Sequence, residues 1–598
     1  MRKVSALILV LALLLASCAV ASPSATDGGD KPPVTVTEPA ESPDGGEEPP
    51  AAKDLTSLEM ARLMGYGINL GNTMEACDSK NRIPGRDPSV YETMWGQPVT
   101  TRDMVKGMKD AGFQTLRVPI AWTNAMDFEN GDYTIGRAYL DRVEEIIDYA
   151  LDEGMYVVIN DHWDHGWWSM FSHPEQAVRD KAMDIFVSMW TQIAERYEKY
   201  DNRLIFEPAN EEWGNRFNDK TPFNPTGGNL TQDECYELLT VAAQKFVDTM
   251  RGLGGNNASR FLLIPGYNTD VAMTCDGRFK MPTDTAGNKL LLSVHYYTPW
   301  SYCGDTSGVG QWGTTGDVEE QNTLLEMLTK YTAQGYGIVL GEWGVLDNEG
   351  EDRLGYFNNF LTNCDLYGYC PLLWDTGGLF DRSGTRALNA PDIARLFKDR
   401  STARDSLTRE EIVVNARDNI AWMLKKAADR PEFVVEASEA FAWIMFSSGD
   451  WSTQYSVGDA YKPESITAGA VATDVEVTGP GTYEVALDFT GTGAGYADGI
   501  VFAAVGLING EILFPGYIMD IKEIRINGEP AEPSGKLYTT SDNKVCTRVN
   551  LYNEWVSDIP AEARAAGGDL TGATPAPLEH YVNEHIETIT VIFDYIEG

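Results

Sequence analysis

The sequence is short of positive charge. Lys and Arg together number 47 against 89 Asp and Glu, which gives the 598 residues a net charge of −42 and a pI near 4.4. Such an acidic chain repels phosphate backbones, so we expect no nucleic-acid binding. The acidity indicates solubility rather than a specific cationic partner.

Long apolar runs are also scarce. Beyond the N-terminal segment there is no stretch of eighteen continuous apolar residues, the length that a membrane-spanning helix needs. A hydrophobic content of 43% with 11% aromatic residues nevertheless excludes global disorder. The chain is longer than one typical domain, so we expect several domains.

The N-terminus predicts export. Arg2 and Lys3 precede an apolar run, Val4 to Leu15, that is too short for a permanent membrane span. Residues 15–18, Leu-Ala-Ser-Cys, resemble a bacterial lipobox, in which cleavage after residue 17 leaves a lipidated Cys18. A plain secretory peptide is the alternative. We therefore predict a lipoprotein on the bacterial cell surface, with no membrane contact other than its lipid anchor.

The residues after the lipobox predict a disordered tether. Residues 18–53 are rich in Pro, Gly, Ser, Thr and acidic residues, with almost nothing to bury. Seven cysteines remain besides Cys18, and an odd number in an exported chain leaves at least one thiol unpaired. No CxxC pair indicates a metal site, and the sequence assigns no disulfide.

The alternation of strands and helices predicts a parallel barrel. From about residue 54 to residue 401, short apolar runs alternate with amphipathic helical stretches such as 139–151 and 177–200. Eight such repeats predict the α/β class and a (β/α)₈ TIM barrel. A doubly wound sheet would need a Gly-rich phosphate turn, which is absent. The expected strands are 65–71, 115–120, 156–162, 203–211, 261–267, 289–297, 337–344 and 371–378, and only 268–288 lacks a clear helix.

The pattern changes after residue 401. Thr408 and Glu411 fit a capping box for a helix to about residue 428, either a connector within 402–439 or an extra barrel helix. From residue 440 to 598, short strands broken by turns predict an antiparallel β-sandwich domain. Exposed aromatic rings would make it a carbohydrate-binding module, whereas buried rings would make it a spacer. The rings are those of Trp443, Trp451, Tyr455, Tyr461, Tyr538, Tyr552 and Trp555.

Polar residues follow the expected strands at their carboxyl ends, which face the active site of a parallel barrel. Glu211 and Glu342 end the fourth and seventh strands, and two acids across one site are the minimum equipment for cutting a glycosidic bond. Arg117 is expected to keep Glu342 ionised while a less solvated Glu211 keeps its proton longer. Glu207, deeper in its strand, is interpreted as structural.

These segments, in this order, resemble glycoside hydrolase family 5, in particular the cellulase and xyloglucanase branch often called subfamily 4. The resemblance covers about residues 58–396. One departure is Trp163, where relatives often have a second His. The matching segments are GINLGNT at 67–73, LRVP at 116–119, NDH at 160–162, FEPANE at 206–211, HYY at 295–297 and GEWG at 341–344.

The resemblance implies roles for individual residues. Glu211 would be the general acid/base and Glu342 the nucleophile of a retaining double displacement. The supporting residues would surround the sugar at the cleaved bond: Asn210 at its 2-hydroxyl, His295 beside the acid/base, Tyr297 and Arg117 beside the nucleophile, His162 against the sugar and Trp374 as its stacking floor.

Two further groups of residues suggest a ligand: a pair of histidines and a set of loop tryptophans. His162 and His165 form an HxxH pair, but it lies in a loop without a third ligand at a zinc spacing, so we expect no catalytic metal and no cofactor. A structural ion such as calcium, in either domain, is left open. Tryptophans in loops near the strand ends are candidates for flanking sugar subsites, with core packing as the alternative. These are Trp167, Trp168, Trp300 and Trp312, whereas Trp190 lies within a helical stretch and is expected in the core.

The sequence thus predicts a monomeric, retaining endo-β-1,4-glucanase that acts on plant β-glucan polysaccharides: cellulose-like chains, mixed-linkage glucan or xyloglucan. A β-mannanase or xylanase is the alternative within the same chemistry, since loops choose the sugar. A non-catalytic glycan-capture lipoprotein is the alternative outside it, and the presence of both Glu211 and Glu342 disfavours this.

Overall fold

The computed structural model describes residues 55–78, 85–127, 131–304, 311–346, 351–430, 437–449, 451–457, 461–542, 545–556, 558–560 and 562–598. These residues divide into two compact units, 55–430 and 437–598. The predicted signal peptide at 1–17, Cys18 and the tether to residue 53 lie outside the described residues. Among the residues that are described, none of the helices is both long and apolar enough to cross a membrane.

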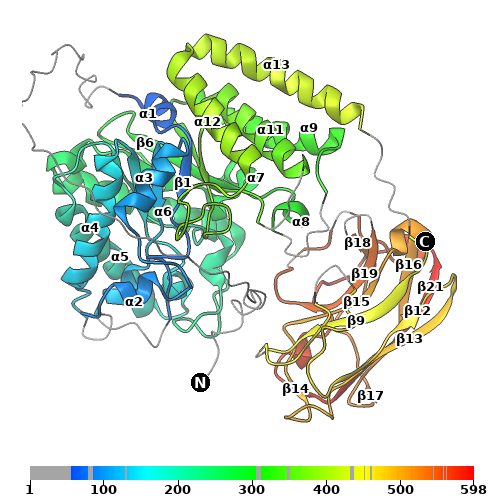
Figure 1. The fold of residues 1–598 in the computed structure, drawn as a ribbon. Helices are drawn as coiled ribbons and strands as arrows, with labels where there is room; N and C mark the ends of the chain where they lie inside the picture. The colour runs from blue at the N-terminus through cyan, green and yellow to red at the C-terminus, as the bar shows by residue number, and fades with distance from the viewer. Residues whose placement is uncertain are drawn as a thin grey trace, which may run out of the picture. The chain divides into compact units, whose positions relative to one another are not determined.

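Eight parallel strands close into a barrel in sequence order, which confirms the (β/α)₈ fold (Figure 1). Nearly every residue of these strands is buried, because helices cover the outer face and side chains fill the interior. The strands are therefore continuous apolar runs rather than alternating ones. They are β1 Gly67–Asn69, β2 Thr115–Val118, β3 Tyr156–Asn160, β4 Leu204–Glu207, β5 Leu262–Pro265, β6 Leu290–Tyr296, β7 Gly337–Trp343 and β8 Cys370–Leu373.

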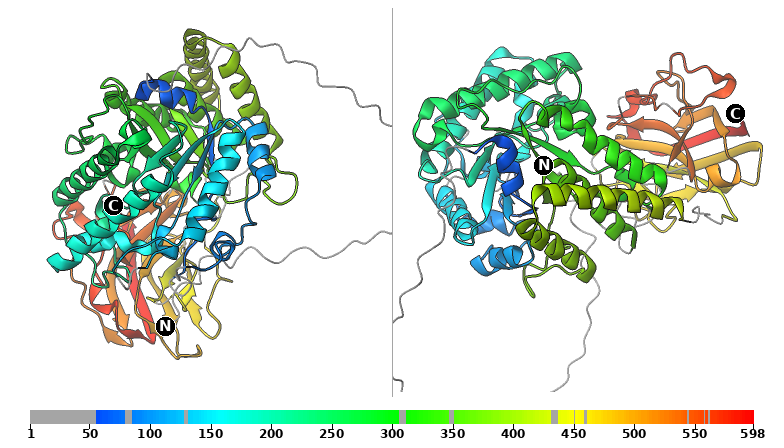
Figure 2. Two further views of the ribbon diagram at one scale, coloured as in Figure 1. Left: turned by 90° about the vertical axis from the view of Figure 1, so that its left-hand side faces the viewer. Right: turned by 90° about the horizontal axis from the view of Figure 1, so that it is seen from above.

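Helices surround the barrel strands in all three ribbon views (Figures 1 and 2). Between β5 and β6, where the sequence shows little helix pattern, the main helix is the single turn α7. The helices are α1 Ser57–Leu63, α2 Ser89–Glu92, α3 Arg102–Asp110, α4 Arg137–Asp152, α5 Gln176–Arg196, α6 Gln232–Leu253, α7 Val271–Thr274, α8 Trp300–Cys303, α9 Thr315–Met327, α10 Thr329–Thr332, α11 Glu351–Tyr367 and α12 Pro391–Ser406.

An additional helix, α13 Arg409–Ala428, completes the barrel unit. Its capping box is formed as predicted, with Thr408 and Glu411 each accepting a hydrogen bond from the other's backbone N–H. The helix packs against α11 and α9, with Met423 and Ala427 buried. It is therefore an extra helix of the barrel unit rather than an isolated connector.

The cysteines of the barrel unit contribute packing rather than cross-links. No disulfide joins the six that are described there, and five of these are buried. A buried thiol behaves as a small apolar side chain. The stability of the described barrel therefore rests on its core.

The C-terminal unit is an antiparallel β-sandwich, as predicted. One sheet has the order β10-β9-β15-β19-β18 with β12 also paired to β9, the second has the order β11-β13-β21-β16-β17, and β14 pairs with β20. The sheets share one apolar core, in which Phe446 of β9 meets Phe489 after β13 at 4.8 Å between ring centroids. The elements are β9 Phe441–Ser447, β10 Gln454–Tyr455, β11 Val471–Thr473, β12 Val475–Glu476, β13 Gly481–Asp488, β14 Ala497–Asp498, β15 Phe502–Leu507, α14 Gly510–Leu513, β16 Tyr517–Ile526, β17 Glu529–Pro530, β18 Thr540–Asp542, β19 Cys546–Asn553, β20 His585–Ile586 and β21 Thr588–Glu597.

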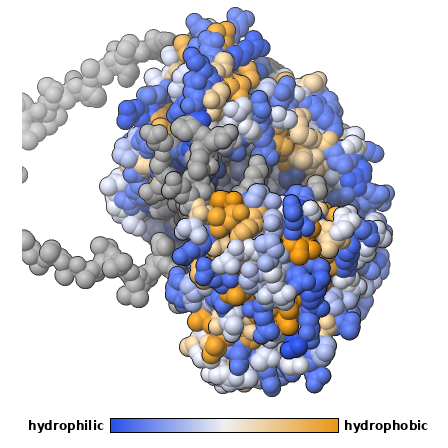
Figure 3. All heavy atoms as spheres, turned by 90° about the vertical axis from the view of Figure 1, so that its right-hand side faces the viewer, coloured by the Kyte–Doolittle hydropathy of each residue, from blue (hydrophilic) through white to orange (hydrophobic). Residues whose placement is uncertain are grey.

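The surface matches the charged composition. The face drawn in Figure 3 is mostly hydrophilic, with separate apolar patches. Scattered apolar side chains on a soluble domain are normal, so only clusters of them need an explanation.

Trp190 tests the barrel core. It is fully buried on α5, lies 5.0 Å from Phe246 between ring centroids, and donates a hydrogen bond to the carbonyl of Pro208. We predict that Trp190→Ala lowers the free energy of unfolding of the barrel by about 3–5 kcal/mol, because it removes a large ring and leaves a cavity. Urea unfolding followed by near-UV circular dichroism would measure this. Trp422→Ala, at a ring 53% exposed on α13, is the matched control and should change little; equal losses in both variants would contradict the assignment.

Candidate active site

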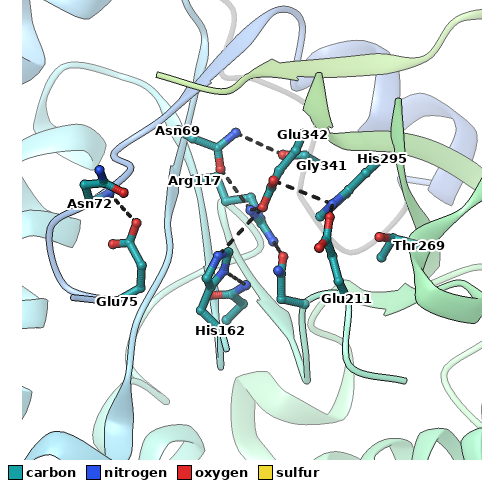
Figure 4. Close-up of polar contacts among 12 residues, drawn as sticks. Asn69, Asn72, Glu75, Arg117, His162, Glu211, Thr269, His295, Gly341 and Glu342 are labelled. Carbon is teal, nitrogen blue, oxygen red and sulfur yellow. Dashed lines mark hydrogen bonds and ion pairs between the residues drawn. The ribbon is translucent and has the colours of Figure 1, made fainter. Parts of the chain in front are cut away.

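The polar residues predicted at the strand ends converge at the carboxyl end of the barrel. The register of the strands brings Asn69 beside Arg117 and His295 beside Glu342. Figure 4 shows Arg117, Glu342, His295 and Glu211 directed toward one another, although they come from four different strands or the loops after them. The structure therefore brings these residues together at one end of the barrel.

Arg117 is the hub of this site. Its guanidinium is fully buried and donates four hydrogen bonds: from Nε to Glu207 at 2.8 Å, from Nη1 to Asn69 and Glu342 at 2.9 Å each, and from Nη2 to Asn210 at 2.8 Å. A planar guanidinium offers these donors in a fixed fork. The fork thus fixes one oxygen of Glu342 and the side-chain oxygen of Asn210.

Glu207 holds the hub in place. One of its oxygens accepts from Arg117, and the other accepts from the hydroxyl of Ser293 at 2.7 Å. The side chain is fully buried, so its charge would be costly without Arg117. The structural role interpreted from the sequence agrees with these contacts.

A glycine lets Glu342 reach the hub. The register of β7 shifts between Leu340 and Trp343, which redirects the side chains at the end of the strand. A Cβ on Gly341 would lie 2.8 Å from Oγ of Ser293 and 3.0 Å from Nε2 of His295, closer than such atoms pack. Only glycine therefore fits between these side chains.

The two catalytic candidates lie close together. One oxygen of Glu211, one of Glu342 and a ring nitrogen of His295 all lie within 4.8 Å of one another. Nδ1 of His295 is 2.9 Å from Glu211 and 3.7 Å from Glu342, and Tyr297 donates to Glu342 at 3.2 Å. Inverting glycosidases separate their acids by about 6.5–9.5 Å to admit a water, and retaining ones by about 5–5.5 Å. The spacing thus fits direct attack by one carboxylate.

Arg216 is a site residue that the sequence analysis missed. It lies in the short helix η3, Asn215–Asn218, and its Nη1 donates to Oε2 of Glu211 at 3.0 Å. Glu211 therefore has both oxygens engaged, one by His295 and one by Arg216. The only signal in the sequence is a cation five residues after the acid, which says nothing about how the loop folds back.

Two buried acids that the sequence analysis did not single out shape the loops around the site. Glu75 accepts from the backbone N–H groups of Asn72 and Thr73, and Glu212 accepts from the N–H of Asn210 at 3.1 Å. Burial raises the pKa of each to about 7. Their hydrogen bonds fix the turns after β1 and β4, and Figure 4 shows the contact between Asn72 and Glu75.

The proton distribution differs from the sequence-based expectation. Burial raises the pKa of Glu342, against the opposing effects of His295 and Arg117. Burial also acts to raise the pKa of Glu211, but the hydrogen bond from His295 and the charges of His295, Arg216 and Arg117 outweigh it and lower this pKa. The expected order was the reverse, because it omitted Arg216 and His295.

The pKa of His295 shifts in the opposite direction to that of Glu211. Burial lowers its pKa, but Glu342 and Glu211 outweigh burial, so that the pKa of His295 is raised. The two carboxylates therefore favour the protonated imidazole more than water does. This imidazole lies within hydrogen-bond distance of Glu211.

His162 and Trp374 form the opposite wall. Their ring planes are 5° apart with centroids at 5.8 Å, and Nε2 of His162 lies 3.9 Å from Glu342. Burial lowers the pKa of His162 well below its usual range, so this ring is neutral near pH 7. Trp374 is only half-buried, which leaves ring area for a ligand.

Three of the four candidate subsite tryptophans are core residues instead. Trp167, Trp168 and Trp312 are at most 1% exposed, so no sugar can stack on them. The chain after β3 turns back at His165 and Gly166, both with positive φ, and stacks Trp167 on Trp168 inside the unit. Only Trp300 of the four, 66% exposed, keeps a free ring face.

The donor set fits hydrogen bonding better than metal binding. The spacing of Glu211, His295 and Glu342 would suit a cation, yet their oxygens already accept from the guanidinium groups of Arg117 and Arg216. The HxxH pair does not converge, since His162 contacts Asn160 and His165 contacts Asn124. A further cation would meet two fixed positive charges.

Substitution of Arg117 tests how strongly the buried charges of the site depend on one another. We predict that Arg117→Met lowers the free energy of unfolding by about 3–5 kcal/mol, because it leaves two buried carboxylates without their cation. The double variant Arg117→Met/Glu207→Gln should recover part of this loss, since it removes one of the unpaired charges. Chemical denaturation of the four proteins of this cycle measures the coupling; additive losses would show that the two side chains do not depend on each other.

Comparisons with known proteins agree with this geometry. The family described as cellulase (glycosyl hydrolase family 5) matches residues 80–378, half of the chain. The xyloglucan-specific endo-β-1,4-glucanase of Bacteroides ovatus is 33% identical over 373 residues, 58% of this chain and 70% of the relative. Endoglucanase A of Paenibacillus barcinonensis is 33% identical over 363 residues, 55% of this chain and 85% of the relative.

Solved structures give the same result. A GH5-4 broad specificity endoglucanase from Ruminococcus champanellensis with bound cellotriose is 30% identical, with a TM-score of 0.51, and the match covers 57% of this chain and 98% of that one. A GH5-4 broad specificity endoglucanase from an uncultured bovine rumen ciliate is 31% identical, with a TM-score of 0.50 over 59% of this chain and 100% of that one. The family match over half of the chain and the relatives covered over more than two thirds of their length show that this chain belongs to glycoside hydrolase family 5.

Proposed function

We propose that the protein is a retaining endo-β-1,4-glucanase that cleaves plant β-glucans: cellulose-like, mixed-linkage or xyloglucan chains. The observation that carries this is the spacing of Glu211 and Glu342, with carboxylate oxygens within 4.8 Å at the carboxyl end of the barrel. Relatives described as endoglucanases and as a xyloglucan-specific enzyme support the choice of polymer.

In the first step, an oxygen of Glu342 attacks the anomeric carbon while the glycosidic C–O bond breaks. The proton of Glu211 passes to the departing sugar oxygen, and the product is a glycosyl ester of Glu342. Arg117 keeps the other carboxylate oxygen in place by its bond at 2.9 Å. Asn210, oriented by the same guanidinium, is positioned for the sugar 2-hydroxyl.

In the second step, Glu211 acts as a base. Its carboxylate takes a proton from water as the water oxygen attacks the anomeric carbon, and the ester bond to Glu342 breaks. Two inversions at one carbon retain the configuration. Glu342 regains its charge and Glu211 its proton, so a second cycle can begin.

Binding of the polymer itself prepares the acid. The glycosidic oxygen must approach an oxygen of Glu211, and the one that does not face His295 is held by Arg216. Displacement of Arg216 removes a positive charge that lowers the pKa of Glu211. The pKa of Glu211 then rises, which favours the protonated form that protonation of the leaving group requires.

Hydrolysis assays test the function. We predict that the wild-type chain releases reducing ends from carboxymethyl cellulose, barley β-glucan and xyloglucan, and that Glu342→Ala loses this activity by several orders of magnitude because no nucleophile remains. Glucomannan and xylan belong in the same assay, since preference for either would favour mannanase or xylanase activity. Polymer binding without hydrolysis by the wild type would favour a glycan-capture protein.

The pH profile tests Arg216. The alkaline limb of kcat/KM reports the pKa of the essential acid in the free enzyme. Arg216→Gln removes a cation that lowers the pKa of Glu211, so we predict that this limb moves to higher pH. Arg216→Lys keeps the charge and is the control, with a limb near that of the wild type. An unmoved limb in Arg216→Gln would show that the contact has no influence on Glu211.

We also propose that the enzyme acts as a monomer at the bacterial cell surface, held by a lipid on Cys18, with its sandwich domain binding glycan. The lipobox-like sequence at residues 15–18 supports the attachment. We predict that Cys18→Ser, expressed in a bacterium that processes lipoproteins, moves from the detergent phase to the aqueous phase in Triton X-114 partition. The wild-type chain in the aqueous phase would favour a plain secretory peptide.

A further inference from the structure

We propose that Trp451 and Trp555 form a glycan-binding site on the C-terminal sandwich, which takes the flat apolar faces of a neutral β-glucan chain. The proposal rests on the proposed function, because its occupant is the polymer that the barrel would cleave. It goes further by assigning the binding to two residues.

The structure separates the seven aromatic candidates of this unit by exposure. Trp451 and Trp555 are 37% and 59% exposed. The other five are buried or half-buried, and two of these, Tyr455 and Tyr461, donate their hydroxyls to Asp474. Two rings are therefore available to a polymer, and the remaining ones are packing residues.

The two available rings meet although their residues are 104 positions apart in the sequence. Their centroids are 5.5 Å apart with planes tilted by 44°. In the sheet, Phe502 at the start of β15 pairs with Ser447 of β9 on one side and with Asn553 of β19 on the other. The loops after β9 and β19 therefore lie at the same end of the sheet, and each presents one tryptophan.

Both tryptophans are held by their backbone. The N–H of Trp451 donates to the carbonyl of Ser448 at 2.9 Å, and the side chain of Gln454 donates to the carbonyl of Trp451 at 3.3 Å. The N–H of Trp555 donates to the side chain of Asn553 at 3.1 Å. A ring mounted on a fixed backbone loses little conformational freedom when it binds a ligand.

The backbone of Trp451 is also strained. Its φ is 60°, a left-handed conformation that a bulky residue rarely adopts. Such strain costs of order 1–3 kcal/mol and persists where the surroundings enforce it, often at ligand-binding positions. Packing of a fully buried ring could offset the free energy of this strain. The ring of Trp451 is partly exposed to water, so packing alone does not explain why the strain is kept.

The chemistry of the patch favours a neutral sugar. Pyranose rings present flat C–H faces to aromatic rings, and a chain with net charge −42 disfavours an anionic ligand. A second copy of the chain is a poor occupant, because two tryptophans bury at most about 500 Å², whereas a stable interface needs about 800 Å² per partner. A sugar site here would raise the effective concentration of polymer near the barrel.

The test measures binding without hydrolysis. The full chain with Glu342→Ala is run in native gels that contain soluble barley β-glucan, which slows the migration of a protein that binds it. Its retardation is compared with that of the triple variant Glu342→Ala/Trp451→Ala/Trp555→Ala. We expect this triple variant to bind about tenfold more weakly, whereas Trp422→Ala, a solitary exposed tryptophan of the barrel unit, changes nothing. Trp451→Phe/Trp555→Phe in the same Glu342→Ala chain should keep most of the retardation.

Two controls separate the proposal from a folding defect and from the proposed function. With Glu342 intact, Trp451→Ala/Trp555→Ala should hydrolyse cellotetraose at the wild-type rate. A chain that ends at residue 430 keeps a barrel unit that matches 98% of a solved structure, so its fold does not need the sandwich. One outcome is that the shortened chain migrates freely in the β-glucan gel while the tryptophan variant is still retarded. Glycan then binds elsewhere on the sandwich, and the inference is overturned. The glycan-binding function of the sandwich would still hold.

If neither change alters retardation, the sandwich does not bind glycan, and both the inference and the module's proposed function are wrong. Sedimentation velocity tests whether a second copy of the chain binds to the two tryptophans instead. A wild-type dimer that becomes a monomer in Trp451→Ala/Trp555→Ala would overturn the sugar site in favour of a contact between copies.

Discussion

The active site depends on the burial of one guanidinium. Arg117 has no contact with solvent, and its four hydrogen bonds reach Glu207, Asn69, Glu342 and Asn210. A buried cation is stable only with paired anions and satisfied donors, so this residue forces the surrounding strands to supply them. The requirement orients Glu342 and Asn210, which lie at the ends of different strands.

The two carboxylates that share Arg117, Glu207 and Glu342, differ in their other contacts. Glu207 is fully buried and has both oxygens engaged, so it balances Arg117 without taking part in chemistry. Glu342 shares the guanidinium, which leaves its other oxygen to Tyr297 and His295. Glu211 is contacted by different groups, Arg216 and His295. Glu211 and Glu342 therefore differ in the groups that shift their pKa values.

The sequence predicted the barrel well because parallel strands covered on both faces appear as short continuous apolar runs. It placed the ends less well: the run at 203–211 is a strand only over Leu204–Glu207, since Pro208 opens the loop that carries Glu211. The acids, Arg117 and His295 were predictable because each follows or ends an apolar run at the carboxyl end of a strand. Position in a strand determines which edge of the barrel a side chain reaches.

Features that depend on loop folding were not predictable. Whether Trp167 or Trp300 faces solvent is decided by how a loop turns, and the sequence contains the same residue type at both positions. Arg216 reaches Glu211 only because of the way the loop after β4 leads into η3. The meeting of Trp451 with Trp555 depends on strand order in a sheet, which no local pattern specifies.

The central claim is that Glu342 becomes covalently bonded to the sugar. A 2-deoxy-2-fluoro-cellobioside with a good leaving group slows the release of a glycosyl ester more than its formation, so that the ester accumulates. Peptide mass spectrometry of the inactivated enzyme should place the sugar on the peptide that contains Glu342, in one equivalent per chain. An adduct on Glu211, or hydrolysis with inverted configuration and no adduct at all, would contradict the account.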